Sequence, residues 1–303
     1  MSELVLSLEI GGTKLQAALG RSDGTILEKE RGAADASAGA ESILAWFTTS
    51  VPSLLDRATQ RGDTVRSIGV GFGGPVDSAA GTALVSHQVG GWSGFPLKDW
   101  FEQHFSLPAV IANDSNAAGW AEYCCGAGMG TRHFCYMNIG SGIGGALVID
   151  GRLHDGQGFG AAEIGHTYVP DFTSSEPGAK NKLENLCSGW SIEKRLRATS
   201  LLDVGTPLFT KCAGDPRRIT CGLLGEAAYE GDRFANDAID CVAQALAVAL
   251  SNVITLIHPE RIAMGGGVSL MGDVLLKPLR KHVDAIVFGP YRNRYSIVPC
   301  ALG

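Results

Sequence analysis

Residues 4–27 read LVLSLEIGGTKLQAALGRSDGTIL, and this stretch sets the fold of the chain. An apolar run ends at the glycine pair Gly11-Gly12, a second apolar run extends from Leu15 to Leu19, and the turn dipeptide Asp23-Gly24 follows. Short apolar runs that end in an Asp-Gly turn are typical of β-hairpins. We therefore predict that Gly11 to Lys14 form the tip of a hairpin and not the N-terminus of a helix.

The second half of the chain repeats this order. Residues 134–139 run into a loop from Gly140 to Gly145, residues 146–149 form the second apolar run, and Asp150-Gly151 supplies the turn. In each half a helical stripe of apolar side chains follows, and then a strand and a further glycine cluster. The stripes cover residues 42–58 and 238–257, and the clusters are Gly73-Gly74 and Gly265-Gly266-Gly267. This repeat predicts a duplicated α/β unit.

The glycine loops indicate a site for an anion. Glycine lets several backbone N–H groups point at one phosphate, because it has no side chain in the way. Walker and dinucleotide loops lead into a helix, whereas these loops lead into strands, so both of those interpretations are disfavoured. An acid lies between the first two loops, in Asn113-Asp114-Ser115-Asn116. Together these features predict phosphoryl transfer.

Length and charge limit the class of protein. A chain of 303 residues is typical of about two domains. The net charge of -6 comes without a cluster of Lys and Arg, which disfavours a nucleic-acid partner. No apolar run approaches the roughly 20 residues that span a membrane, and no signal-type leader is present. We expect a cytoplasmic protein with no membrane partner, whose eight cysteines are reduced, mostly buried thiols.

Six motifs follow one another along nearly the whole chain. They are Glu9 to Lys14, Gly73 to Asp77, Asn113 to Ala118, Gly140 to Gly145, Glu163 to His166 and Gly265 to Val268. Their order resembles the ROK family of sugar kinases and repressors. The resemblance implies a duplicated actin-like, ribonuclease-H-like α/β fold with a cleft between two lobes, which we place at residues 1–115 and 116–303.

The repressors of this family carry a helix-turn-helix segment ahead of the first glycine strand. Only residues 1–3 precede that strand here. We therefore expect a kinase and not a DNA-binding protein.

Asp114 lies where a predicted strand, residues 110–112, ends and a predicted helix, residues 115–125, begins. An ionised Asp can accept the proton of a sugar hydroxyl during phosphoryl transfer. An Asp at this point can also cap the helix, a role worth about 1 kcal/mol. Position alone leaves both roles open. The resemblance to ROK kinases assigns Asp114 as the catalytic base.

The resemblance also implies a set of sugar-binding residues. Asn113 can offer a donor and an acceptor to a hydroxyl, although Asn is also a common turn residue. Glu163 and His166 are three residues apart, which suits one face of a helix, but a surface ion pair has the same spacing. Gln88 stands where relatives have an Asn, which leaves the preferred sugar open. The full set is Gly74, Gln88, Asn113, Asp114, Glu163, His166 and Glu184.

ATP-binding residues are implied in the same way. The first phosphate loop comprises Gly11, Gly12, Thr13 and Lys14; the second comprises Gly140, Ser141 and Gly142; Gly265 and Gly266 flank the adenosine. A glycine triplet by itself is equally consistent with a tight turn. Mg²⁺ is expected with the nucleotide, because it neutralises developing charge and takes one or two carboxylates. Glu9, which replaces the usual Asp of the family, is its expected carboxylate ligand.

Many relatives carry a Cys-x-Cys-Gly-x-x-Gly-Cys segment that forms a structural zinc site. No cysteine lies between Thr167 and Leu186 here, so we predict no structural zinc. The predicted activity is an ATP-dependent, glucokinase-like transfer of the γ-phosphate to the 6-hydroxyl of glucose or a similar hexose. A fructokinase or an N-acetylhexosamine kinase, and a non-catalytic sugar-sensing protein of the same family, are the alternatives. Whether the chain forms a homodimer stays open.

Overall fold

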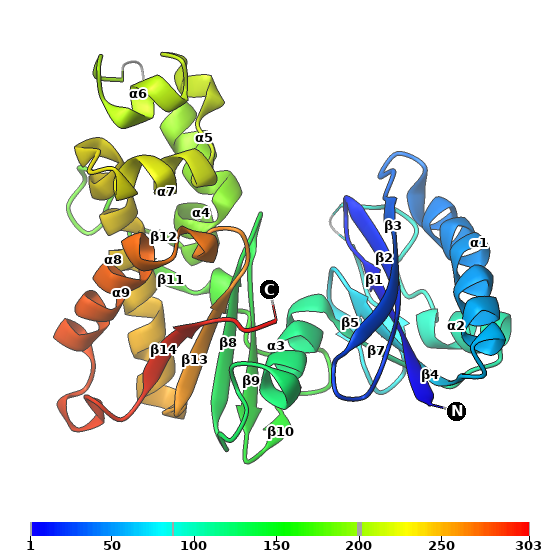
Figure 1. Cartoon of the computed structure of the whole chain (residues 1–303). Coiled ribbons are helices and arrows are strands. Elements are labelled where there is room, and N and C mark those ends of the chain that lie inside the picture. Colours follow the sequence, from blue (N-terminus) through cyan, green and yellow to red (C-terminus); the bar gives the residue numbers. More distant parts are fainter. Residues whose placement is uncertain (1, 87, 199–201, 303) are drawn as a thin grey trace. The chain divides into compact units, whose positions relative to one another are not determined.

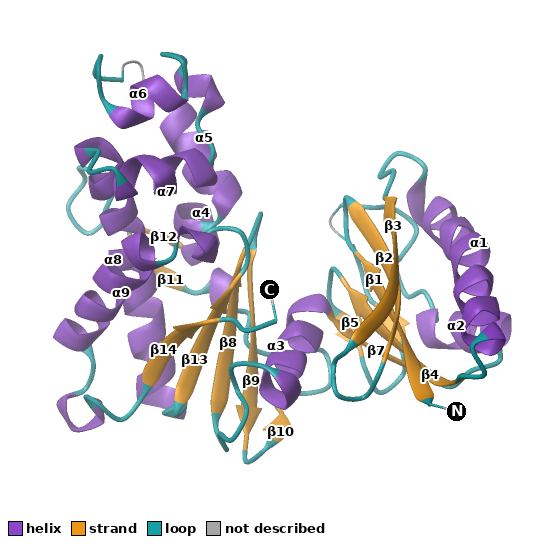
Figure 2. Ribbon diagram, viewed as in Figure 1, coloured by secondary structure: helices purple, strands orange, loops and turns teal. Residues whose placement is uncertain are grey.

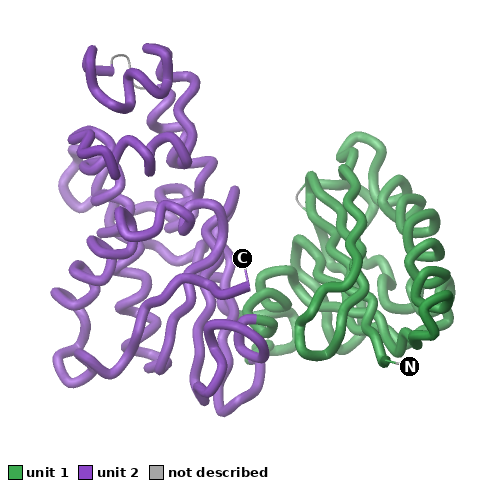
Figure 3. Tube along the Cα trace, viewed as in Figure 1, with its two compact units in different colours: residues 1–121, 154–161 green, residues 122–153, 162–303 purple. Residues whose placement is uncertain are grey.

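The computed structural model describes residues 2–86, 88–198 and 202–302 (Figure 1). The chain separates into two compact units (Figure 3). Unit 1 contains residues 1–121 and 154–161, and unit 2 contains residues 122–153 and 162–303. Unit 1 thus includes two segments, 116–121 and 154–161, that the sequence prediction places in the second lobe.

Unit 1 is built on a five-stranded sheet with the order β3-β2-β1-β4-β7. The first hairpin supplies the antiparallel strands, and β4 and β7 lie parallel to β1. Helices α1 and α2 and the short strands β5 and β6 complete the unit (Figure 2). The bounds are β1 (Glu3–Ile10), β2 (Lys14–Gly20), β3 (Ile26–Ala33), α1 (Gly39–Gln60), β4 (Thr64–Phe72), β5 (Val76–Asp77), β6 (Thr82–Ala83), α2 (Leu97–Phe105) and β7 (Ala109–Asn113).

Periodicity explains why these segments form these elements. In β1 every second side chain, from Leu4 to Ile10, is buried, which is the pattern of a strand with one face on a core. In α1 the buried side chains include Ile43, Phe47, Val51 and Leu54, and this spacing keeps them on one helical stripe. The helix and the strand thereby cover the same core.

Unit 2 repeats the sheet of unit 1. Its order is β10-β9-β8-β13-β14, with an antiparallel hairpin at one side and parallel strands at the other. The predicted duplication of an α/β unit is therefore confirmed. The strands are β8 (Phe134–Ile139), β9 (Ile143–Ile149), β10 (Arg152–Leu153), β13 (Arg261–Gly265) and β14 (Ser296–Pro299).

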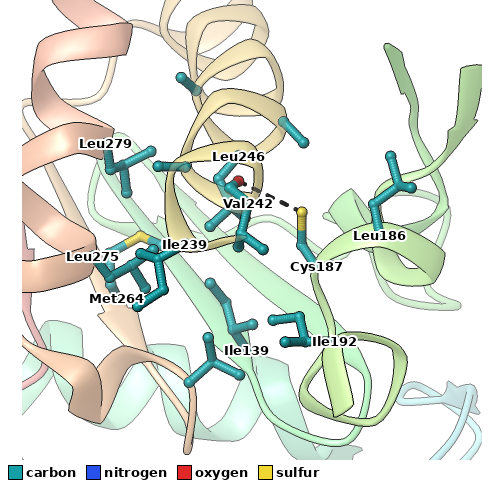
Figure 4. Packing of buried hydrophobic residues seen from close by; sticks show 14 of the residues in the cluster. Ile139, Leu186, Cys187, Ile192, Ile239, Val242, Leu246, Met264, Leu275 and Leu279 are labelled. Carbon is teal, nitrogen blue, oxygen red and sulfur yellow. Dashed lines mark hydrogen bonds between the residues drawn. The ribbon is translucent and has the colours of Figure 1, made fainter. Parts of the chain in front are cut away.

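Helices surround the second sheet and extend unit 2 well beyond it (Figure 1). They are α4 (Leu183–Cys187), α5 (Gly189–Arg197), α6 (Pro207–Lys211), α7 (Cys221–Tyr229), α8 (Arg233–Ile257) and α9 (Asp273–Ile286), with the 3-10 turns η1 (Ile164–His166) and η3 (Ser269–Met271). The core of this unit packs α8 against β8, β13 and α9. Val242 and Leu246 of α8 lie beside Cys187 of α4, whose Sγ is 3.7 Å from the Val242 carbonyl oxygen (Figure 4).

Helix α3 (Asp114–Cys125) follows β7 directly. Its Glu122 is buried at 3% exposure, and its carboxylate accepts hydrogen bonds from backbone N–H groups. The donors are Ala127 at 2.8 Å, Leu302 at 2.8 Å and Ala301 at 3.1 Å. A buried carboxylate is costly unless it is hydrogen-bonded, so this cluster anchors the last described residues of unit 2 to α3.

Residues 168–182, where the sequence departs from the cysteine pattern of the family, form a hairpin. Strands β11 (Tyr168–Pro170) and β12 (Lys180–Lys182) pair antiparallel. Between them, the Asp171 carboxylate accepts hydrogen bonds from the N–H and the hydroxyl of Thr173. No group of three or more His, Cys, Asp or Glu in the described part of the chain has the arrangement of a metal site. Backbone pairing and the contacts of Thr173 therefore order this segment, and the absence of a structural zinc stays a prediction.

All eight cysteines are free thiols, and Cys135, Cys187, Cys212 and Cys221 are buried. Burial raises the pKa of the Cys135 and Cys187 thiols to about 12, which keeps them protonated and unreactive. Cys125, Cys241 and Cys300 are half-buried and Cys124 is exposed, so burial of the thiols holds for four of the eight.

Contrary to expectation, α8 is long and apolar enough to cross a membrane by length and composition. Its most apolar window has a mean hydropathy of 1.7, and 56% of that window is buried within unit 2. The burial of Val242, Leu246 and Leu250 shows that α8 is a core helix of this unit.

Truncation of Leu246 should destabilise unit 2 by creating a cavity. Leu246 is fully buried, so we expect Leu246→Ala to lower the free energy of unfolding by about 2 to 5 kcal/mol. Leu256→Ala on the same helix is the matched control, because Leu256 is 81% exposed. Its effect should stay within about 0.5 kcal/mol. Urea unfolding measures both, and equal effects would contradict the packing described.

Candidate active site

The predicted site residues of unit 1 meet at one edge of its sheet. The register pairs Ile10 with Phe72 and Phe72 with Asn113, so the carboxyl ends of β1, β4 and β7 lie side by side. The Gly73 N–H donates to the Ile10 carbonyl oxygen at 2.8 Å. A Cβ atom on Gly73 would lie 3.5 Å from the Gly11 Cα and 3.6 Å from the Asp114 Oδ2. The first glycine turn, the Gly73-Gly74 turn and Asp114 are therefore neighbours.

Both Asn113 and Asp114 contact the first N–H groups of helix α3. The Asn113 Oδ1 accepts hydrogen bonds from the N–H groups of Ser115 at 3.0 Å and Asn116 at 3.2 Å. The Asn113 Nδ2 donates to the Gly74 carbonyl oxygen at 3.2 Å, which leaves a second amide hydrogen for a ligand. The Asp114 Oδ1 also accepts the Ser115 N–H, at 2.7 Å. Asn113 thus shares the helix terminus with Asp114, and both roles of Asp114 stay open.

The surroundings of Asp114 raise the pKa of its carboxyl above the ordinary value. Burial is the largest cause, and the negative charge of Glu9 adds to it. Hydrogen bonds from Ser115, including its N–H at 2.7 Å, act in the opposite direction. A carboxylate with a raised pKa accepts a proton more readily than an ordinary Asp.

Glu9 faces the partner strand at the predicted metal position. Its carboxylate accepts a hydrogen bond from the side chain of Gln16, the residue paired with it across the hairpin. One oxygen of Glu9 remains for another ligand. Carboxylate oxygens of this kind suit Mg²⁺, and the negative charge of Glu9 contributes to the raised pKa of Asp114. The residues present thus fit a magnesium ion held together with phosphate.

Gln88 lies directly on the first glycine turn. A Cβ atom on Gly12 would be 1.3 Å from the Gln88 Oε1, so only glycine leaves room for this amide. The backbone N–H groups of Gln88 and Val89 donate to the Ser86 hydroxyl and shape the loop. His87, within the segment that departs from the family pattern, lies outside the described residues. The predicted sugar residue Gln88 and the predicted phosphate residue Gly12 are therefore in contact.

In unit 2 the second glycine turn is held by Glu184. The Glu184 Oε2 accepts the N–H of Ile143 at 2.8 Å and would lie 2.6 Å from a Cβ atom on Gly142. The Gly189 N–H donates to the Gly140 carbonyl oxygen at 2.7 Å from the start of α5. Glu184, which we predicted to bind sugar, thus contacts the turn that we predicted to bind phosphate. Ser141 lies at the exposed tip of that turn.

Glu163 and His166 are both exposed and flank the 3-10 turn η1. Gly165, between them, packs so closely on β9 that a Cβ atom would be 2.3 Å from the Ile143 carbonyl oxygen. The η1 turn, which ends at His166, therefore lies against the start of β9, and the sugar-binding role of Glu163 and His166 stays a prediction. In the described part of the chain, no ion pair joins these two residues, and the His166 Nδ1 lies 3.3 Å from the Lys182 Nζ instead.

The third glycine cluster lies beside the second turn. Gly266 has a φ of +82°, and a Cβ atom there would be 2.3 Å from the Asn138 Oδ1 and 2.5 Å from the Ile139 carbonyl oxygen. The Val268 N–H donates to that carbonyl oxygen at 3.0 Å. Gly265 is the last residue of β13, and a Cβ atom there would be 2.9 Å from the Cys300 Sγ. Glycine is thus required at both positions for close approach of the backbone.

Sequence reasoning missed several of these contacts. The pairing of Gln16 with Glu9 could have been found by counting outward from the hairpin tip, because residues at equal distances from a tip face one another. The contact of Glu184 with Ile143 joins residues of different elements, α4 and β9, and no local pattern indicates it.

Comparison with known proteins places these features in a family. The family model described as ROK family matches residues 5–303. The chain is 30% identical to the glucokinase of Thermotoga maritima over 299 residues, which covers 98% of this chain and 92% of that one. It is 31% identical to the glucokinase of Halalkalibacterium halodurans over 285 residues, with 92% and 85% covered.

A solved structure shows the same similarity. The ROK family glucokinase from Streptomyces griseus, in complex with glucose and AMPPNP, superposes with a TM-score of 0.80 at 31% identity. The alignment covers 99% of this chain and 95% of that chain. The predicted actin-like, ribonuclease-H-like α/β fold is confirmed by this likeness and by the repeated sheet order. The chain belongs to the ROK family.

Proposed function

We propose that this protein is an ATP-dependent hexose kinase that transfers the γ-phosphate of ATP to the 6-hydroxyl of glucose or a similar hexose. The relatives named glucokinase, about 30% identical over nearly the whole chain, support this proposal. Within this chain, the observation that carries it is the state of Asp114. Its carboxyl has a raised pKa and lies next to two glycine turns.

The reaction needs a base for the sugar hydroxyl. Asp114 accepts the hydroxyl proton as the sugar oxygen forms its bond to the γ-phosphorus and the bond to the β-phosphate oxygen breaks. The products are the sugar phosphate and ADP, and Asp114 afterwards releases its proton to water. We assign sugar binding to Gly74, Gln88, Asn113, Glu163, His166 and Glu184.

The nucleotide is assigned to the glycine turns. We assign its phosphates to Gly11, Gly12, Thr13 and Lys14, with the Lys14 ammonium, and to Gly140, Ser141 and Gly142. The N–H groups of Gly11 and Gly140 donate within their own turns, so the remaining N–H groups of these turns would serve the phosphates. Gly265 and Gly266 are assigned to the adenosine. Glu9 would hold Mg²⁺, which supplies charge neutralisation to the phosphates when it is bound.

The acceptor and the setting are part of the proposal. Gln88 supports a preference distinct from that of relatives with Asn, so fructose and N-acetylhexosamines belong in any substrate panel. We further propose a cytoplasmic enzyme that acts without nucleic acid or membrane partners, in line with its net charge of -6. A sugar-sensing protein without turnover is the competing proposal, favoured by the Gln88 amide lying on Gly12.

Replacement of the base should abolish turnover while sugar binding persists. We expect Asp114→Asn to lower kcat by about 100-fold to 10,000-fold, because the amide cannot accept the proton. A coupled assay of ADP release across the hexose panel measures this. Asp237→Asn on α8 is the control, since the Asp237 side chain is 75% exposed, and it should leave kcat unchanged. Undiminished turnover in Asp114→Asn would refute the role of the base.

The same assay separates the competing proposals. Saturable sugar binding by the unmodified protein without any ADP release would support the sugar sensor, and ADP release that does not depend on sugar would support a plain ATPase.

The pH dependence should report the raised pKa of Asp114. The base must be ionised, so we expect kcat/KM to fall as the pH drops through a pKa above the ordinary Asp value of about 3.9. Glu9→Gln removes a negative charge that raises this pKa, and the acid limb should therefore move to lower pH. The pH profiles of both proteins provide the measurement, and a shift of that limb to higher pH would contradict the arrangement.

The contact between Gly12 and Gln88 should make their substitutions non-additive. A methyl group on Gly12 must displace the Gln88 amide, so we expect Gly12→Ala and Gln88→Ala each to raise the sugar KM by about tenfold. The double variant should then match the single ones. The KM values for sugar and for ATP are measured separately. A change in the sugar KM reports the loss of the Gln88 amide, and a change in the ATP KM reports damage to the phosphate turn. Strictly multiplicative effects on the sugar KM would rule out the proposed contact as its cause.

A further inference from the structure

Unit 2 contains a cavity of about 540 Å³ between the β11–β12 hairpin and helices α4 and α5. Asp171 and Thr173 line it from the hairpin loop, and Trp190, Lys194 and Arg195 line it from α5. Its described lining includes none of the residues assigned above to sugar, ATP or magnesium. The volume is within the range of about 300 to 1,000 Å³ that is typical of small-molecule sites.

The charges in this cavity favour an anion. In the described part of the chain neither Lys194 nor Arg195 forms an ion pair with a carboxylate; the Arg195 Nη1 donates to the Leu186 carbonyl oxygen at 3.0 Å. The one carboxylate of the described lining, Asp171, accepts two hydrogen bonds from Thr173 and keeps its negative charge, so two cations face one anion there. Two cations without acidic partners are unusual in a chain with a net charge of -6. Their charge is therefore available to a ligand.

Neutral groups of the lining suit hydroxyl groups. The Asn185 Nδ2 donates to the Asn181 Oδ1 at 2.9 Å, which the N–H of Lys182 also contacts. This pairing leaves the Asn181 amide hydrogens and the Asn185 carbonyl oxygen without partners in the described residues. A fixed donor and a fixed acceptor side by side match the vicinal hydroxyls of a sugar.

Trp190 supplies the apolar surface that a sugar ring needs. Its side chain is 61% exposed, and the Lys194 Nζ lies 4.7 Å from the ring centroid. This cation–π contact holds the ammonium over the indole. A flat nucleobase would compete with Lys194 for that face of the indole. A sugar ring can instead pack on Trp190 beside the ammonium while its phosphate contacts Lys194.

We propose that this cavity is a binding site for a monosaccharide phosphate, separate from the residues of phosphoryl transfer. The phosphate contacts Lys194 and Arg195, the hydroxyls contact Asn181 and Asn185, and the ring packs on Trp190. Binding at this site requires no turnover. Its test is therefore independent of the proposed kinase activity.

The emission of Trp190 provides the readout. Glucose 6-phosphate is titrated into the protein in the presence of saturating glucose and a non-hydrolysable ATP analogue, and the fluorescence emission is recorded. The emission change of Trp190→Phe in the same titration is then subtracted, which leaves the contribution of Trp190. We expect a saturable difference. In Lys194→Gln the apparent Kd should rise by about tenfold or more, because a charged hydrogen bond is lost. Lys277→Gln is the matched control on α9, where the side chain is 73% exposed, and should change the Kd by less than about twofold.

Further ligands and one further variant test whether the signal comes from a sugar phosphate bound in this cavity. Glucose and inorganic phosphate, each alone, should bind more weakly than glucose 6-phosphate by about tenfold or more. Asp114→Asn should leave the titration unchanged. The absence of a difference signal, or its loss when the active-site ligands are present, would overturn the proposal. It would also be overturned if phosphate alone or glucose alone bound as tightly as glucose 6-phosphate, or if ATP bound more tightly. Thermal unfolding of every variant establishes that a lost signal is not lost structure.

Discussion

The parallel register of β1, β4 and β7 is the constraint on which the site of unit 1 depends. Backbone hydrogen bonds place Ile10, Phe72 and Asn113 side by side, so the residues that follow each strand emerge at one edge. Gly73 has no side chain, and the Gly11 turn and the Asp114 carboxylate approach it closely for that reason. A register shift of one residue would move every side chain to the opposite face of the sheet. The backbone hydrogen bonds between these strands therefore fix the position of Asp114 independently of side-chain contacts.

The first turn of helix α3 sets the chemical environment of Asp114. Its first turn exposes N–H groups that require a partner, and the Asn113 side chain supplies it. Asp114 keeps a partly buried carboxylate whose pKa rises through burial and through Glu9. In unit 2 a glycine turn likewise joins two antiparallel strands, β8 and β9, although it is one residue shorter, between its last paired residues, than the turn between β1 and β2. A carboxylate contacts it there as well, because Glu184 accepts the Ile143 N–H.

Much of this arrangement follows from local patterns. The apolar runs and the two Asp-Gly turns correctly predict the strands and the hairpins. The apolar stripe over residues 42–58 correctly predicts helix α1. The repeat predicts that both sheets share one strand order. The apolar stripe over residues 238–257 likewise predicts α8, although mean hydropathy alone does not distinguish such a buried core helix from a membrane span.

The sequence by itself determined the secondary structure, the duplication and the family, because periodicity and glycine spacing act over a few neighbouring residues. Only the tertiary structure decided that Asn113 caps α3, that Gln88 lies on Gly12, and that Glu184 holds the second turn. It also formed the cavity beside Trp190 from the β11–β12 hairpin, α4 and α5. These contacts join residues of different elements, so their distances are set by how strands and helices pack and not by any local pattern.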